Sequence, residues 1–97
     1  MKQHRYRITV EHLATAKGEP SPYPAPLQFE VGNHDDLFKI VDILRQRELF
    51  PATATADAFA IGLKLFGEVM LENRDHPLFA ELRPQFVAFM KKLKRGP

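Results

Sequence analysis

The chain has no cysteine among its 97 residues, which excludes disulfide bonds and thiolate metal sites. It has no apolar run long enough to span a bilayer, and its first residues lack the hydrophobic segment of a secretory signal. Its one serine, Ser21, does not lie in a Gly-x-Ser-x-Gly turn of the kind that presents a nucleophile. These absences predict a cytoplasmic protein without a membrane segment.

Glycine-rich nucleotide-binding loops are also missing, because Gly62 and Gly67 fall inside a predicted helix. A glycine there costs about 1 kcal/mol relative to alanine. We therefore interpret Gly67 as a position that lets another helix approach closely. Basic residues gather at both ends of the chain, but the last predicted helix has no basic face with polar base-reading side chains, so nucleic acid is not an expected partner.

A hydrophobic content of 44% and the absence of low-complexity runs predict one folded domain over residues 1–97. The most apolar stretch predicts a central helix over about 55–74, capped by Thr55. Its apolar positions at helical spacing are Phe59, Gly62, Leu63, Phe66, Val69 and Met70. We expect Phe66 in the core, and a solvent strip formed by Asp57, Lys64, Glu68 and Glu72.

Two segments before this helix alternate between apolar and polar residues, which is typical of half-buried strands. They cover about 4–13 and 27–31, and the loop between them, residues 14–26, holds Gly18 and four prolines. The simplest pairing is an antiparallel hairpin with one apolar face, ended by Gly32 and Asn33.

The remaining segments predict two more helices. The first covers about 34–48, with Asn33 as its cap and two aspartates in its first turn. The last covers about 77–94, with Asp75 as its expected cap, and should be bent or split at Pro84. The fold class is therefore α+β, a two-stranded antiparallel hairpin packed on three helices.

A two-stranded sheet leaves backbone groups unpaired along its edges, and proteins normally cover or pair such edges. Two arrangements would do this. A second subunit could pair with a strand edge to form a homodimer, or the 14–26 loop could fold back, with Tyr23 as an anchor. We expect the homodimer, and the sequence leaves the loop as an alternative.

Three blocks together resemble a small bacterial family known only as a domain of unknown function. They are residues 6–13 (YRITVEHL), 27–36 (LQFEVGNHDD) and a third that runs from GLKLFGE at 62–68 to NRDHPLF at 73–79. The likeness covers nearly the whole chain. It implies a free-standing small bacterial protein and brings no activity or catalytic residue with it.

Two polar corners are the candidate ligand-binding sites. Their residues are His34, Asp35, Asp36, Arg74, Asp75 and His76. An imidazole beside carboxylates can bind a metal or move a proton, but aspartates also favour helix starts for electrostatic reasons alone. Pro77 interrupts the spacing that would join His76 to Glu68 and Glu72, so no metal site and no cofactor are expected.

The function expected from these patterns is a non-enzymatic protein-interaction or regulatory module. The alternative is a small enzyme or ligand-binding protein that uses the corners at residues 34–36 and 73–76. A pocket joining those corners would favour the alternative.

Overall fold

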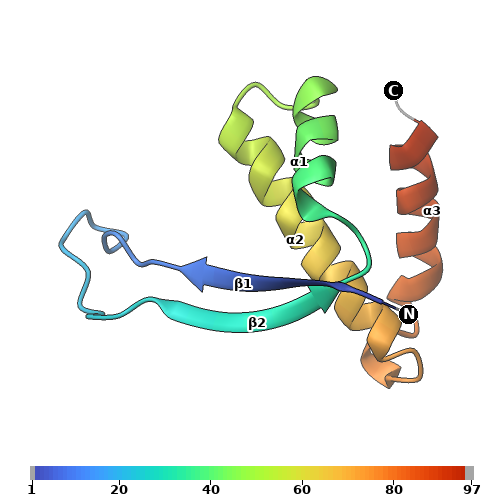
Figure 1. Ribbon diagram of the computed structural model, residues 1–97, viewed down its shortest axis with the longest axis horizontal. Helices are drawn as coiled ribbons and strands as arrows, with labels where there is room; N and C mark the ends of the chain where they lie inside the picture. The colour runs from blue at the N-terminus through green and yellow to red at the C-terminus, as the bar shows by residue number, and fades with distance from the viewer. Residues whose placement is uncertain (1, 96–97) are drawn as a thin grey trace.

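Two antiparallel strands and three α-helices follow one another along the chain in the predicted order. The computed structural model describes residues 2–95. Its elements are β1 (His4–Val10), β2 (Leu27–Asn33), α1 (Leu37–Gln46), α2 (Thr53–Glu72), a short 3-10 helix η1 (Pro77–Phe79) and α3 (Leu82–Arg95). Figure 1 shows the hairpin crossing the second half of α2, with α1 and α3 both to the right of α2 in this view. The predicted α+β fold class is confirmed.

The hairpin pairs Ile8 with Phe29 at its centre, Val10 with Leu27 at its outer end and His4 with Asn33 at its inner end. Directly opposed residues share a face, so the apolar side chains of both strands lie together. The strand bounds differ from those predicted. β1 ends at Val10 rather than near residue 13, and β2 continues past residue 31 because Gly32 and Asn33 still pair with β1.

The proline-rich loop continues the hairpin away from the three helices (Figure 1). It closes on itself: a hydrogen bond of 2.6 Å joins His12 Nδ1 and Ser21 Oγ, and the Tyr23 ring meets the His12 ring edge-on at 5.1 Å. Ala14 and Pro20 form a bridge across it. Tyr23 is therefore an anchor within the loop, and the loop does not fold back over the sheet.

The first helix begins later than the predicted 34–48, because Asp36 and not Asn33 caps it. The Asp36 carboxylate accepts from the backbone N–H groups of Phe38 and Lys39, at 3.0 and 3.4 Å. The helix ends at Gln46, and Glu48 then adopts a left-handed backbone conformation with φ of 53°. Only glycine adopts this conformation without steric cost.

The central helix α2 begins at Thr53, two residues before the predicted start, with Ala52 in the cap position; Thr55 does not cap it. Its buried residues are Ala56, Ala60, Glu68 and Met70. Two predictions were wrong here. Phe66 is 40% exposed, and Glu68, expected in the solvent strip, is 7% exposed. Of the helices between Lys2 and Arg95, none has both the length and the apolar character needed to cross a membrane.

The predicted last helix, 77–94, is divided into η1 and α3. The break lies at residues 80–81, before Pro84, and not at Pro84 itself. Pro84 is the third residue of α3, where a backbone N–H would have no helical partner, so it starts the helix without bending it. The Phe86 ring lies 3.5 Å from where a side chain on Gly67 would begin. That distance is an ordinary van der Waals contact, so a side chain would fit at Gly67, and the close helix approach expected there is not found.

The molecule exposes far more surface than its size requires. Its solvent-accessible surface is 7788 Å², whereas a folded monomer of this mass exposes about 5,700 Å². The radius of gyration is 15.8 Å, against about 12.5 Å for a compact domain of this length. None of the residues of α3 is buried, and much of the hairpin lies beyond the helices. The fold therefore leaves apolar faces without cover.

The left-handed residue after α1 gives a first testable prediction. Glu48→Gly should raise the free energy of unfolding by about 0.5–1 kcal/mol, because glycine removes the backbone strain at φ of 53°. Gln46→Gly, in the last turn of the same helix, should instead lower it by about 1 kcal/mol. Urea unfolding at one protein concentration measures both. An equal loss of unfolding free energy in the two variants would show that the backbone at Glu48 is not strained.

Candidate functional site

The predicted corner at residues 34–36 lies where the inner end of the hairpin meets α2. Its centre is the buried carboxylate of Glu68, which accepts a hydrogen bond from Gln3 Nε2 at 3.0 Å. His34 Nδ1 lies 3.0 Å from the other oxygen of Glu68. The inner end of the hairpin is thus joined to the last part of α2 by two polar contacts, from residues that flank the strands, that share one acid. Buried carboxylates are found in such settings because an unpaired one would be costly.

Gly32 makes the Gln3 contact possible. A Cβ built at position 32 would collide with Oε1 of the Gln3 side chain. Gln3 therefore crosses the strand where no side chain stands in its way. This close approach explains why the second strand continues through a glycine.

Asn33 is the most completely buried large side chain between residues 2 and 95, at 1% exposure. Its Nδ2 donates to the Lys64 carbonyl at 3.1 Å, and its Oδ1 accepts from the Asp35 backbone N–H at 2.9 Å. It therefore joins α2 to the turn between β2 and α1. Both ends of its amide are satisfied, as a buried polar group requires.

Asp35 forms an ion pair with Lys64, whose Nζ lies 2.8 Å from Oδ2. Burial on its own raises the pKa of the Asp35 carboxyl. The hydrogen bond and charge of Lys64, helped by His34 and Lys94, outweigh burial and hold that pKa below its usual value. His34 Nε2 lies 3.6 Å from the same carboxylate, so His34 stands between two acids, Asp35 and Glu68.

The second predicted corner lies in the turn after α2. Arg74 and Asp75 are exposed there. His76, and not Asp75 as predicted, caps η1, because its Nδ1 accepts from the Leu78 backbone N–H at 3.1 Å. The His76 ring also packs on Phe79, with centroids 5.5 Å apart.

The two corners do not form one site. In residues 2–95 no hydrogen bond or ion pair joins residues 34–36 to residues 73–76, and no pocket found there is lined by both. The same part of the chain holds no group of three His, Asp or Glu side chains placed to bind a metal ion. Its buried side-chain polar atoms all have hydrogen-bond partners. The 34–36 corner attaches the hairpin to the helices.

Sequence reasoning missed the residues that make this attachment. Glu68 and Lys64 were placed in a solvent strip, and Asn33 was interpreted as a helix cap. The contacts involved span 29 to 65 residues along the chain, from the Asp35–Lys64 ion pair (64 − 35 = 29) to the Gln3–Glu68 hydrogen bond. One signal was available: charged residues beside the most apolar helix stripe are either solvated or paired with a distant partner.

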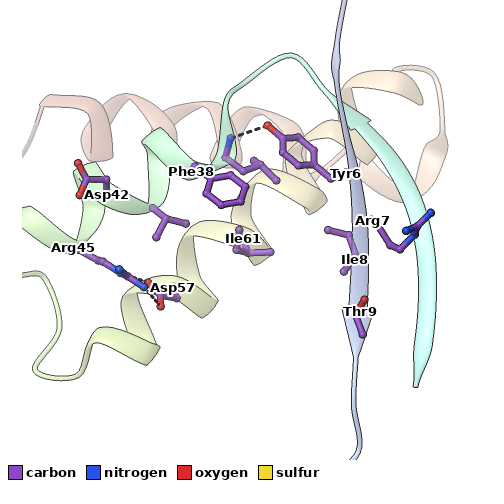
Figure 2. A pocket seen from close by; sticks show the side chains of 11 residues that line it. Tyr6, Arg7, Ile8, Thr9, Phe38, Asp42, Arg45, Asp57 and Ile61 are labelled. Carbon is purple, nitrogen blue, oxygen red and sulfur yellow. Dashed lines mark hydrogen bonds and ion pairs between the residues drawn. The ribbon is translucent and has the colours of Figure 1, made fainter. Parts of the chain in front are cut away.

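A groove of about 680 Å³ runs along the outer edge of β1, between that strand and the two helices α1 and α2. Figure 2 shows Tyr6 and Ile8 pointing from β1 toward it, with Phe38 and Ile61 on the helical side. Phe38 is 80% exposed. At the outer end of the groove Arg45 donates two hydrogen bonds to the Asp57 carboxylate, at 2.7 and 2.6 Å.

The Arg45–Asp57 ion pair shifts the pKa values of both side chains. The hydrogen bond from Arg45 holds the pKa of the Asp57 carboxyl below its usual value and raises the pKa of the guanidinium. Both groups therefore stay charged at neutral pH, and they mark a polar rim beside an apolar groove. An apolar floor with a charged rim is the usual anatomy of a binding surface for protein.

The outer half of the hairpin presents a second apolar surface. Val10 is 52% exposed, Leu27 63% and Phe29 42%, and all three lie on the face that carries Tyr6 and Ile8. The inner half of this face packs on the helices, whereas the outer half extends past them (Figure 1). We call these three residues the bare arm face.

An α+β hairpin fold with an open strand edge and a bare arm does not by itself define an activity. Residues 4–95 match the model of the family described as a domain of unknown function with a solved structure (DUF3861). The chain belongs to this family, so the resemblance seen in the sequence is confirmed.

One solved structure is similar over almost the whole chain. It is the crystal structure of a protein of unknown function from Pectobacterium atrosepticum SCRI1043. The two chains are 40% identical, the match covers 97% of this chain and 99% of the other, and the TM-score is 0.81. Among curated proteins, none matches this chain.

Asn33 gives the second prediction. Asn33→Ala should lower the free energy of unfolding by about 1–3 kcal/mol, because it removes two hydrogen bonds from a buried site. Gln28→Ala, at an exposed position of the same strand, should change it by less than about 0.5 kcal/mol. Urea unfolding at fixed protein concentration compares them. Indistinguishable stabilities would show that Asn33 does not hold the hairpin.

Asp35 gives a prediction about pH. Since its folded-state pKa is lowered, its contribution to stability is present above the pKa of the unfolded chain and is lost as pH falls through the folded value. The free energy of unfolding should therefore decrease as the solution is acidified below about pH 4. Asp35→Asn and Lys64→Gln should each weaken this dependence by a similar amount. A wild-type pH profile in both variants would refute the assignment to this pair.

Proposed function

We propose that this protein is a non-enzymatic protein-interaction module that works as a homodimer joined through the hairpin. The observation that carries the proposal is the bare arm face, formed by Val10, Leu27 and Phe29. Soluble monomers seldom leave contiguous apolar surface of this kind uncovered, and where they do it marks an interaction site.

The size of the uncovered surface supports the same proposal. The chain exposes about 2,100 Å² more than a compact monomer of its mass. A stable protein interface needs about 800 Å² from each partner. A second copy could therefore bury a full interface and leave the rest of the surface ordinary.

The polar corners support a structural role better than a catalytic one. Asp36 caps a helix, His76 caps another, and His34 and Asp35 are engaged with Glu68 and Lys64. These contacts occupy four of the six groups that the alternative proposal, a small enzyme or ligand-binding protein, would use, and leave Arg74 and Asp75 exposed. The similar bacterial protein supports a bacterial setting, and a cytoplasmic location is part of the proposal that cell fractionation can test.

Light scattering coupled to size exclusion tests the proposal. At micromolar concentration the wild-type chain should have twice the monomer mass of 11.1 kDa. Leu27→Asp should shift the mass toward the monomer, because it places a charge on the bare arm face at a position 63% exposed in the single chain. Gln28→Asp, on the opposite face, should remain dimeric.

Two results would count against this function. A single monomer-mass peak at high micromolar concentration would refute the homodimer. A dimer that persists unchanged in Leu27→Asp would show that the arm is not the interacting surface.

A further inference from the structure

The sheet leaves two edges without a strand partner in the described residues, one on β1 and one on β2. The β2 edge is the poorer choice for a partner. Its inner end lies against α2, where Gln3, close over Gly32, and His34 both contact Glu68. Pro26 directly precedes the outer end of β2, and it has no N–H to donate to a neighbouring strand. The β1 edge has neither obstacle, and it opens onto the groove shown in Figure 2.

The groove fits an added sheet better than an added helix. Neighbouring strands lie about 4.8 Å apart, so two strands added to β1 would lie about 5 and 10 Å beyond it, above the helical side of the groove. That side offers apolar side chains from Phe38, Val41 and Ile61. An added strand would also satisfy the open backbone groups of β1, which a helix could not.

The bare arm face is apolar, and so is the helical side of this groove. In an antiparallel pairing of two β1 strands, the outer end of each hairpin lies beside the inner end of the other. The partner's Val10 would then lie next to Tyr6, where the groove begins. One contact would therefore cover the groove and the bare arm face of both copies together.

Charge fixes the register of such a pairing. A twofold axis perpendicular to the sheet places one residue opposite its own copy and keeps the apolar faces on the same side. If that residue is Ile8, Arg5 lies opposite the partner's Glu11, and Arg7 opposite the partner's Thr9. Opposite charges on directly opposed residues stabilise a strand pair.

The neighbouring registers fit less well. With Arg7 on the axis, the two Arg7 side chains would lie opposite each other, and like charges in that position destabilise the pair. With Thr9 on the axis, only residues 8–10 of β1 would pair with their copies, and Arg5 would lie opposite Leu13, which carries no charge. The register centred on Ile8 pairs Tyr6 to Val10 of the two β1 strands and sets Arg5 opposite Glu11, the residue that follows β1, so it is the one of the three that pairs base with acid.

We propose that two copies of this chain join their β1 edges antiparallel with Ile8 on the twofold axis. They form a four-stranded sheet in which the outer half of each hairpin covers the β1-side groove of the other copy. This proposal rests on the proposed function, and it adds the edge, the register and the surface that the arm covers.

Single-cysteine variants test it directly, because the chain has no cysteine of its own and any disulfide must join two copies. Directly opposed residues have Cα atoms about 4.5–5.5 Å apart, within disulfide range. Ile8→Cys should therefore form covalent dimers under mild oxidation, seen on non-reducing gels and by mass spectrometry. Arg7→Cys and Thr9→Cys should not, since their copies would lie about 8 Å apart.

A second variant guards against loss of folding in Ile8→Cys. Arg5→Cys combined with Glu11→Cys should give dimers that hold two interchain disulfides. These positions are about 20 Å apart within one chain, so they cannot bridge internally. Each of the two single variants of this pair should stay uncrosslinked.

The outcomes separate this proposal from the proposed function. Crosslinking through Gln28→Cys, Phe29→Cys or Glu30→Cys would place the pairing on β2, and crosslinking through Arg7→Cys alone would shift the register. Either result overturns the proposal while the homodimer stands. If Phe38→Asp still has the mass of a dimer, the partner's arm does not cover the groove, and that part of the proposal is overturned. Monomeric wild-type protein would refute both proposals.

Discussion

The hydroxyl of Tyr6 joins the sheet to the start of α1. It donates to the Asp35 carbonyl at 2.8 Å and accepts from the Leu37 backbone N–H at 2.9 Å. With the buried amide of Asn33 and the shared carboxylate of Glu68, it fixes the hairpin at its inner end. The outer end has no comparable attachment to the helices, so the hairpin projects as an arm (Figure 1). The placement of every exposed apolar side chain on the sheet follows from this one-sided attachment.

Attachment by hydrogen bonds at one end sets the direction in which the hairpin leaves the helices as well as holding it to them. Apolar contacts tolerate sliding, whereas hydrogen bonds to single atoms fix an angle. Here four polar side chains on the sheet side, Gln3, Tyr6, Asn33 and His34, bond to backbone or carboxylate atoms on the helical side. The arm therefore leaves the helices in a defined direction before any partner arrives. A surface that is ordered in advance loses less conformational entropy on binding.

The parts of the fold that depend on local patterns could be predicted from the sequence. The alternation around Ile8 and Phe29 gave the strands, and apolar spacing gave the three helices. Gly67 was interpreted as a position of close helix approach, but a side chain there would meet the Phe86 ring only at an ordinary contact distance. Element ends were less well predicted: Asp36 and Asn33 are both good caps by type, and the distant bond to Lys64 decides between them.

The candidate site shows more clearly which features could not be predicted from the sequence. His34, Asp35 and Asp36 are indeed close in space, but the partners that define their roles, Glu68 and Lys64, belong to a helix thirty residues away. Periodicity alone assigns a charged residue to solvent, since a distant partner leaves no local trace. The exposure of Phe66 has a related cause. Its ring packs edge-on against Phe79 and Phe86 at one side of a thin core, and such a core cannot enclose it.

The thin core and the open edge are two aspects of one constraint. A chain of this size can bury most of its apolar side chains only if its layers close over one another. In this fold the sheet is too narrow to close over α1 and α2, because it has two strands and extends sideways past them. In the proposed homodimer, two more strands from an identical chain would supply the missing layer without any new sequence. The arm that a single chain leaves bare would then be the cover that the other chain lacks, and this match is the reason for proposing self-association over an unrelated partner.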